Sequence, residues 1–284
     1  MKSAKFISAS LIVGENPLYN PQDGKLYFVD IRGKCFYKAS INGEILEKID
    51  LPEQVGCLAI CEDGDILLGM ETGVYILDKN GKLTLAHQSE TILGRRFNDG
   101  KVGVDGAYYL GTTDDQGKGA FYRLKEGVLT KLFDGAKCSN GLDWSLDGKQ
   151  MYYVDSPLKK VEVFDFDWTK ENPLSNRRIC CDLANIIPEK AVPDGMCIDK
   201  DGNLWVAVWL GGKILKIDPK QGCVIDQIEV EVNKPSSCTF FGENLDQMLI
   251  TSAGFLEEDC NAGSLYTASV GASGFKINFY KKGN

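Results

Sequence analysis

Four polar residues that could bind a metal ion occupy nearly the same place in a repeating pattern of this sequence. Asn98, Asn140 and Asp194 each lie seven residues before an Asp-Gly pair, and Glu15 lies eight residues before another. Residues at one phase of a repeat occupy one level of the resulting structure. If the repeats close into a ring, two amides and two carboxylates meet near its axis. Oxygen ligands of this kind suit Ca²⁺, Mg²⁺ or Mn²⁺, although Zn²⁺ could also enter, so the pattern predicts a divalent-cation site.

The elements that must position these side chains are short strands. Five of the Asp-Gly pairs, which begin at residues 23, 63, 105, 147 and 201, each precede an apolar run such as LYFVD or MYYVD. A sixth unit contains MLITS (248–252), and a second strand-like segment follows the first in every unit. Runs rich in Val, Ile, Tyr and Phe between Gly, Asp and Asn are typical of β-strands. Six such units predict an all-β, six-bladed β-propeller with the metal site in its central channel.

The ring is expected to use residues 1–284 as a single domain. We expect an N-terminal strand over 5–13 to pair with a C-terminal strand over 275–280, because this pairing would remove the exposed edge. The insertion over 178–191 is the best helix candidate, although Pro188 interrupts it. A β-sandwich with chance Asp-Gly turns is the alternative fold, but it would not produce five regularly spaced copies of one pattern. The Gly-His and Trp-Asp signatures of WD40 repeats are absent.

Composition and charge narrow the classes of function. A hydrophobic content of 43% with 25% charged residues is typical of a soluble globular protein, and no apolar stretch approaches the roughly 20 residues of a membrane span. The net charge of −8 argues against a nucleic-acid or anionic-membrane partner. Ten scattered cysteines with one histidine, His87, predict reduced thiols packed as small apolar residues. We therefore expect a cytoplasmic protein with no obligate protein partner.

Each polar motif also has a structural interpretation. Asn or Asp before Gly is a common turn former, so Asn140-Gly141 and Asp194-Gly195 could simply be turns, and Glu15 could lie in a solvated loop. For a single motif the turn is the simpler explanation. Four motifs at a shared phase favour a common site instead, because a turn requires no carboxylate at position 15.

The longer strings around these residues resemble a known family. The chain is similar, essentially from end to end, to the SMP-30/gluconolactonase/regucalcin-like family through GENPLYNPQDGKLYFVDI, RRFNDGK, SNGLDWSLDGKQMYYVDS and PDGMCIDKDGNLWVAVW. This resemblance implies a six-bladed propeller that binds one divalent cation, preferably Ca²⁺, and hydrolyses sugar lactones. It implies that Glu15, Asn140 and Asp194 are metal ligands, that Arg96 binds the substrate, and that Asn98 contacts the substrate or a metal-bound water.

The implied chemistry is hydrolysis of an aldonolactone to the aldonic acid. The cation would polarise the lactone carbonyl and lower the pKa of a bound water. Asp194 is the candidate general base, because a ligating carboxylate can also reach the attacking water. A hydroxide on the metal is the alternative base. Asp99 is expected to support its loop rather than to take part in the reaction.

The segment over 112–119 departs from the family pattern. In the family this loop often supplies a substrate contact, and here Thr113, Asp114, Asp115 or Gln116 could supply one, without a clear match. The preferred lactone is therefore left open. Two rival functions also remain at this stage: an organophosphate-ester hydrolase with the same kind of site, and a calcium-binding propeller without catalysis. Trp205 is expected to pack in a strand core rather than stack on a sugar.

Overall fold

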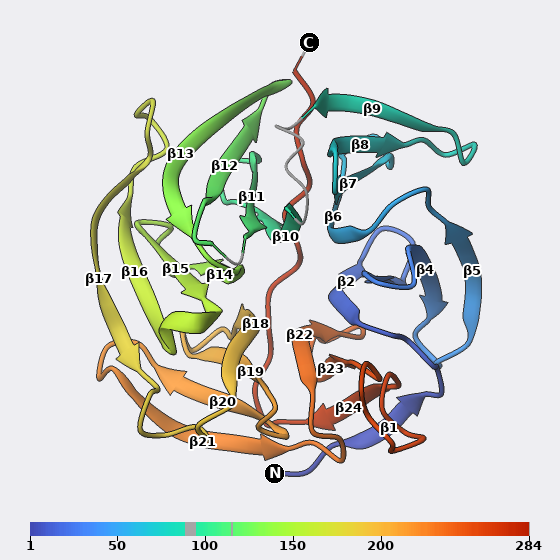
Figure 1. Ribbon diagram of the computed structural model, residues 1–284, viewed down its shortest axis with the longest axis vertical. Helices are drawn as coiled ribbons and strands as arrows, with labels where there is room; N and C mark the ends of the chain where they lie inside the picture. The colour runs from blue at the N-terminus through green and yellow to red at the C-terminus, as the bar shows by residue number, and fades with distance from the viewer. Residues whose placement is uncertain (89–94, 115, 284) are drawn as a thin grey trace.

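The structure is a computed structural model, and it describes residues 1–88, 95–114 and 116–283. In this part of the chain, the strands form six four-stranded antiparallel sheets around a central channel (Figure 1). The predicted all-β, six-bladed propeller is confirmed. No helix in the described residues is long and apolar enough to cross a membrane.

Each sheet forms one blade, and its first strand lies beside the channel. Blade 1 comprises β2 (Gly14–Asn20), β3 (Lys25–Asp30), β4 (Cys35–Ser40) and β5 (Ile45–Asp50). Blade 2 comprises β6 (Val55–Ile60), β7 (Ile66–Met70), β8 (Gly73–Leu77) and β9 (Leu83–Gln88). Blade 3 comprises β10 (Arg96–Val102), β11 (Tyr108–Thr113), β12 (Gly119–Lys125) and β13 (Val128–Ala136).

The second half of the ring repeats this order. Blade 4 comprises β14 (Ser139–Trp144), β15 (Gln150–Asp155), β16 (Lys160–Phe166) and β17 (Leu174–Asp182). Blade 5 comprises β18 (Val192–Ile198), β19 (Leu204–Trp209), β20 (Lys213–Asp218) and β21 (Cys223–Glu229). Blade 6 comprises β22 (Pro235–Phe241), β23 (Gln247–Ser252), β24 (Leu265–Ser269) and the N-terminal β1 (Ala4–Ile7).

In blades 1 to 5, the apolar run after the Asp-Gly pair is the second strand of the blade, whereas the sequence pattern indicated a first strand. The Asp-Gly pairs form the turns between the first and second strands, so the apolar runs that follow them are second strands (β3, β7, β11, β15 and β19). The polar motifs themselves lie within the innermost strands. The residue pattern did not predict these innermost strands, because they contain Gly, Asn and Asp, which have low β-propensity.

Ring closure differs from the expected pairing of 5–13 with 275–280. The N-terminal strand β1 pairs with β24, with Ala4 opposite Thr267, and so becomes the outer strand of blade 6. The C-terminal segment instead crosses the ring (Figure 1). The Gly274 N–H donates to the Leu245 carbonyl, and the Tyr280 N–H donates to the Ile60 carbonyl. We call residues 273–281 the C-terminal strap.

The helix expected over 178–191 is also absent from the structure. Its first part belongs to β17, where Arg178 and Ile179 pair with Val163 and Glu162 of β16. The remainder forms turns between β17 and β18. Pairing with an adjacent strand satisfies the backbone polar groups of Arg178 and Ile179, and Pro188 is incompatible with the interior of a helix.

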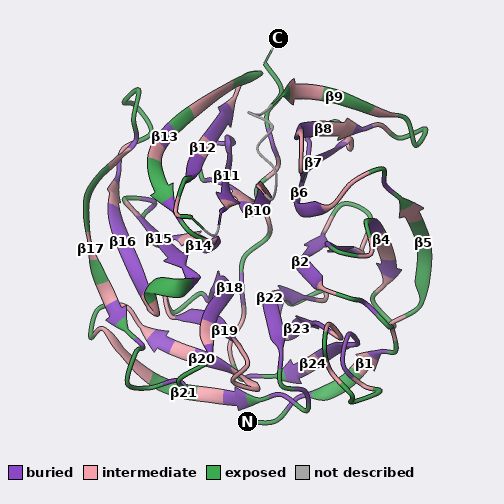
Figure 2. Cartoon of the chain, viewed as in Figure 1, coloured by how far each residue is buried: buried purple, intermediate pink, exposed green. Residues whose placement is uncertain are grey.

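Burial decreases from the channel outward (Figure 2). Strand β6 is fully buried. In β5, at the rim of blade 1, Ile49 is half-buried and the other residues are exposed. Trp205 is fully buried and donates from Nε1 to Asp199 Oδ2 at 3.0 Å, which confirms its expected packing role. All ten cysteines lie within the described residues as free thiols, and six of them are buried.

Candidate functional site

The predicted site residues lie on the innermost strands of four blades. Glu15 lies on β2, Asn98 on β10, Asn140 on β14 and Asp194 on β18. All four are buried, with exposed fractions between 5% and 7%. The first strands of neighbouring blades contact one another around the channel. The fold therefore brings together residues that are up to 179 positions apart in the sequence.

A break in the strand pairing accounts for the shared phase. The register between first and second strands shifts between Glu15 and Leu18, between Phe97 and Gly100, and at the corresponding places of blades 4 and 5. An extra residue at a β-bulge bends the strand and redirects side chains, and bulges are frequent beside active sites. The recurring bulge therefore places one motif from each of these four blades at the same level of the channel.

Glycines let the innermost strands approach one another at this level. A Cβ built on Gly56 would lie 2.2 Å from the Phe97 carbonyl oxygen and 2.5 Å from that of Asn98. A Cβ on Gly141 would lie 2.6 Å from the Asp194 carbonyl oxygen. These distances are well inside van der Waals contact, so residues with side chains would separate the strands that carry the site.

Glu15 and Asp194 are two buried carboxylates, and repulsion acts between them. Burial raises the pKa of Glu15 well above its ordinary value, and repulsion by Asp194 and Asp99 raises it further. Burial likewise raises the pKa of Asp194, followed by repulsion from Asp99. The positive charge of Arg96 acts in the opposite direction on both. A cation placed between Glu15 and Asp194 would relieve their repulsion and favour their ionised forms.

Arg96 and Asn98 form a pair at the start of β10. Arg96 Nη1 donates to Asn98 Oδ1 at 2.6 Å and to the Phe97 carbonyl at 3.0 Å. Asn98 Nδ2 donates to the Ser139 carbonyl of blade 4 at 2.7 Å. The Asn98 amide therefore holds the guanidinium on one side and the neighbouring blade on the other. A second lone pair on its oxygen could still accept a bond from a substrate hydroxyl.

The Asn140 amide leaves an oxygen available for a metal. Its Nδ2 donates to Ser156 Oγ at 3.0 Å, which fixes the orientation of the amide. Its Oδ1 is buried and has no hydrogen-bond partner in the described part of the protein. The amide also lies close enough to Asp194 to lower the pKa of that carboxyl. A buried acceptor beside carboxylates is a fitting ligand for a hard cation, since an unpaired buried polar atom is otherwise costly.

The donor set has two carboxylates and one amide. Within residues 1–88, 95–114 and 116–283, no three His, Cys, Asp or Glu side chains are grouped as metal ligands. The predicted set of Glu15, Asn140 and Asp194 contains only two side chains of these types. The observed chemistry of the donors thus fits Ca²⁺ or another oxygen-binding cation better than a thiolate-bound or imidazole-bound metal.

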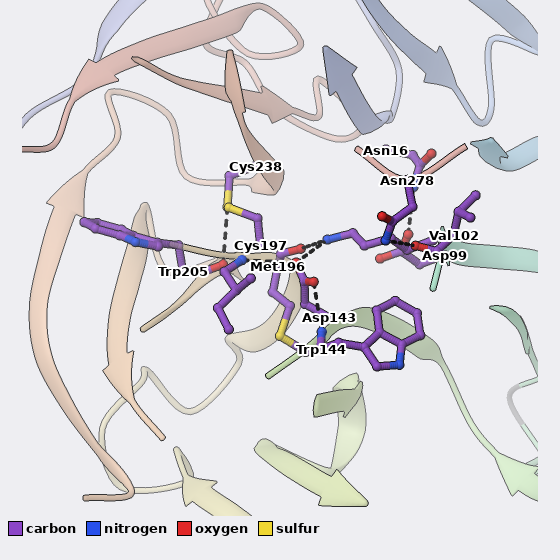
Figure 3. A network of polar contacts seen from close by, with 12 residues as sticks. Asn16, Asp99, Val102, Asp143, Trp144, Met196, Cys197, Trp205, Cys238 and Asn278 are labelled. Atoms are coloured by element: carbon purple, nitrogen blue, oxygen red, sulfur yellow. Dashed lines mark hydrogen bonds and ion pairs between the residues drawn. The ribbon is translucent and has the colours of Figure 1, made fainter. Parts of the chain in front are cut away.

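Sequence reasoning missed a set of polar contacts deeper in the channel. Asn16 Nδ2 donates to Asp99 Oδ1 at 2.8 Å and Asn16 Oδ1 accepts from the Leu58 N–H at 2.9 Å, which links blades 1, 3 and 2. Lys101 Nζ lies 2.7 Å from Asp143 Oδ2, which links blades 3 and 4. Figure 3 labels Asn16, Asp99 and Asp143 of this set. The repeat contained a signal for them, since Asn16 lies seven residues before Asp23, and Lys101 and Asp143 each lie four residues before an Asp-Gly pair.

The segment after β11 is held by internal bonds. Asp114 Oδ2 lies 3.1 Å from Arg95 Nη2, and both side chains are only 9% exposed. Thr113 Oγ1 donates to the Lys137 carbonyl, and the Gln116 N–H donates to Asp114 Oδ1. Asp115 lies outside the described residues. The Asp114 carboxylate therefore has a structural partner, and a substrate contact from this segment remains a prediction.

A separate cavity of about 250 Å³ is lined by residues of the innermost strands and of the C-terminal strap. Its lining includes Asp99, Lys101, Asp143 and residues 275–278 of the C-terminal strap, but none of the four motif residues. The motifs lie near the beginning of the innermost strands, whereas the strap contacts Ile60 and Val102 at their ends. The predicted site and this cavity therefore lie at different depths of one channel.

Comparisons with known proteins agree with this architecture. The family described as "SMP-30/Gluconolactonase/LRE-like region" matches residues 13–254. Regucalcin from Xenopus laevis is 34% identical over 258 residues, which cover 87% of this chain and 85% of that protein. A luciferin-regenerating enzyme has a TM-score of 0.90 at 27% identity, with 98% of this chain and 99% of that one covered.

A second solved structure is equally similar in fold. Regucalcin from Agrobacterium tumefaciens, described as a calcium-binding protein, has a TM-score of 0.90 at 25% identity, with 99% of this chain and 97% of that one covered. The family match spans far more than half of the chain. This protein is a member of the SMP-30/gluconolactonase/LRE-like family.

Proposed function

We propose that this protein is a divalent-metal-dependent lactonase that hydrolyses a sugar lactone to the aldonic acid. The single observation that carries the proposal is the buried, unpartnered Asn140 Oδ1 beside the repelling carboxylates of Glu15 and Asp194. Burying an unpaired amide oxygen beside two repelling carboxylates costs free energy unless a cation is bound, and these oxygens suit Ca²⁺. Membership of a family whose name includes gluconolactonase supports the choice of lactone as substrate.

Each residue then has a defined task. Glu15, Asn140 and Asp194 would hold the cation, which when bound would polarise the lactone carbonyl and acidify a water molecule. Asp194 would accept the proton of the attacking water on a carboxylate oxygen. Its ionised form is required for both tasks, and the positive charge of Arg96 favours that form.

Arg96 would bind and orient the sugar. Its guanidinium is held by Asn98 and by the Phe97 carbonyl, so part of its donor set is already fixed in direction. The remaining N–H groups could donate to lactone hydroxyls or to the carboxylate that forms on ring opening. Asn98 would contact the substrate through its oxygen and keep Arg96 in place.

The experiment is a pH-stat assay of aldonolactones, because hydrolysis at neutral pH releases one proton for each acid formed. Protein stripped with EDTA is assayed alone and with Ca²⁺, Zn²⁺, Mn²⁺ or Mg²⁺, and an organophosphate ester is run in parallel. We expect lactone hydrolysis that disappears with EDTA and returns with a divalent cation, Ca²⁺ first. Faster turnover of the organophosphate ester would identify the rival hydrolase, and Ca²⁺ binding without any turnover would identify a calcium-binding propeller.

A further inference from the structure

Lys101 joins the three innermost strands that carry Asn98, Asn140 and Asp194. It lies on β10 of blade 3, and its Nζ contacts Asp143 Oδ2 of β14 at 2.7 Å. The same Nζ donates to the Met196 carbonyl of β18 at 2.9 Å. Figure 3 labels Asp143 and Met196, the two residues that Lys101 contacts. One ammonium group therefore binds blades 4 and 5 to its own blade.

Asp143 completes the connection between these strands. Its Oδ2 also accepts a hydrogen bond from the Ile198 N–H of β18 at 3.1 Å, and its Oδ1 accepts from the Trp144 N–H at 2.9 Å. The carboxylate is thus fixed to β14 and β18 as well as to Lys101. With 25% and 16% of the Lys101 and Asp143 side chains exposed, the pair borders the cavity instead of being enclosed by apolar packing.

This connection lies a short distance along the strands from the site. Lys101 follows Asn98 by three residues, Asp143 follows Asn140 by three, and Met196 follows Asp194 by two. At about 3.3 Å per residue, these steps correspond to roughly 7 to 10 Å along each strand. Such short stretches of strand transmit a change of position at Lys101 directly to the motif residues.

The ladder hydrogen bonds cannot fix the separation of these residues. β10, β14 and β18 belong to different sheets, so no ladder of backbone hydrogen bonds joins them. The bulge next to each motif also interrupts the pairing of each strand within its own blade. Contacts between blades must therefore set how far Asn140 lies from Asp194.

We propose that Lys101 is a positioning residue for the cation site, because its ammonium group fixes the separation of β10, β14 and β18. The inference rests on the proposed function, since it assumes that Asn140 and Asp194 bind the cation. Residues that orient metal ligands from a second layer typically change metal affinity by about 10-fold to 100-fold when they are replaced.

The direction in which Ca²⁺ affinity changes when Lys101 is replaced distinguishes a positioning role from a purely electrostatic one. Lys101 is positively charged, so its long-range field repels a cation in the channel. If charge alone mattered, Lys101→Met would bind Ca²⁺ more tightly than the parent protein. If Lys101 positions the ligands, the same variant binds Ca²⁺ more weakly.

The test measures Ca²⁺ binding by titration calorimetry on the full chain, with folding checked by circular dichroism and melting temperature. We expect the Ca²⁺ Kd of Lys101→Met to rise about 10-fold to 100-fold, and Lys101→Arg to recover most of the affinity. The matched control is Lys216→Met. Lys216 is also largely buried and lies 3.4 Å from Asp199, but this ion pair stays within blade 5, so its loss leaves the Kd unchanged.

A double variant removes the unpaired charge that Lys101→Met leaves behind. Lys101→Met/Asp143→Asn keeps an acceptor for the Ile198 N–H, and we expect it to be more stable than Lys101→Met while its Ca²⁺ affinity stays low. If Lys101→Met fails to fold, the double variant carries the test. Parent-like or tighter Ca²⁺ binding by either variant overturns the positioning role alone, whereas a parent protein that binds no divalent cation overturns the proposed function with it.

Discussion

Replacing Asp194 by asparagine should stabilise the metal-free protein and reduce the further stabilisation that Ca²⁺ provides. In the metal-free protein, burial and repulsion by Asp99 raise the pKa of the Asp194 carboxyl, so its ionised form opposes folding at neutral pH. Asparagine has nearly the same shape and carries no charge. We therefore expect EDTA-treated Asp194→Asn to melt at a higher temperature than the EDTA-treated parent protein.

The Ca²⁺-dependent part of this prediction can be given a magnitude. A ligand at 100 times its Kd stabilises the folded state by about 2.7 kcal/mol. An unfolding entropy of about 2.1 cal/mol/K per residue gives about 0.6 kcal/mol/K for 284 residues, so the parent should gain about 4.5 °C. If losing one charged ligand weakens Ca²⁺ binding about 100-fold, the variant gains only about 0.4 kcal/mol, or less than about 1 °C.

Scanning calorimetry in EDTA, and then at a Ca²⁺ concentration 100 times the parent Kd, measures both effects. Asp201→Asn is the matched control, because it is the same substitution at an exposed turn of the same blade. The control should keep the full Ca²⁺-dependent rise. An equal rise in Asp194→Asn, or a lower melting temperature of the metal-free variant, would refute the assignment of Asp194 as a buried ligand.

Three further predictions address the substrate, the packing of the channel and the effect of pH. Arg96→Ala should raise the KM for a lactone about 10-fold to 100-fold without raising the Ca²⁺ Kd, and parallel losses of both would argue against a substrate contact. Gly56→Ala should lower the free energy of unfolding in urea by about 1 to 3 kcal/mol, because its Cβ would overlap the Phe97 carbonyl; unchanged stability would contradict this close approach. For the metal-free protein, the stability from protonated Glu15 and Asp194 is fully present below about pH 4 and is lost as the pH rises through their raised folded-state pKa values. The stability difference between the parent and Asp194→Asn should therefore widen with rising pH in EDTA, and a constant difference would count against it.

The blades could be predicted from the sequence because their turns have a local residue pattern, whereas the innermost strands and the ring closure have none. Asp-Gly turns recur because glycine adopts the positive φ that the turns require, as at Gly106 with φ of 76° and Gly202 with φ of 87°. Their spacing therefore identified five blades, and the apolar run MLITS (248–252) indicated the sixth. The innermost strands escaped detection because their bulges replace β-branched residues by Asn, Asp and Gly. Ring closure escaped detection because β1 pairs with β24 across almost the whole sequence, and no local pattern specifies that partner.

The candidate site was predictable in part for the same reason. A bulge at a constant offset from each turn places Asn98, Asn140 and Asp194 at one level, so counting residues located them without any knowledge of the strand boundaries. The same offset includes Asn16, which was overlooked because the neighbouring carboxylate of Glu15 was the stronger metal-binding signal. The bond from Lys101 to the Met196 carbonyl could not be read from residue types, since its acceptor is a backbone atom.

The central claim is that Glu15, Asn140 and Asp194 bind one divalent cation. The most direct measurement is a crystal structure of the full chain with Ca²⁺, collected at a long wavelength so that anomalous scattering locates the ion. We predict one anomalous peak in the channel, with oxygens of all three residues about 2.3 to 2.6 Å away. A peak beside Asp99 and Asp143, or no ordered peak at saturating Ca²⁺, would contradict the account.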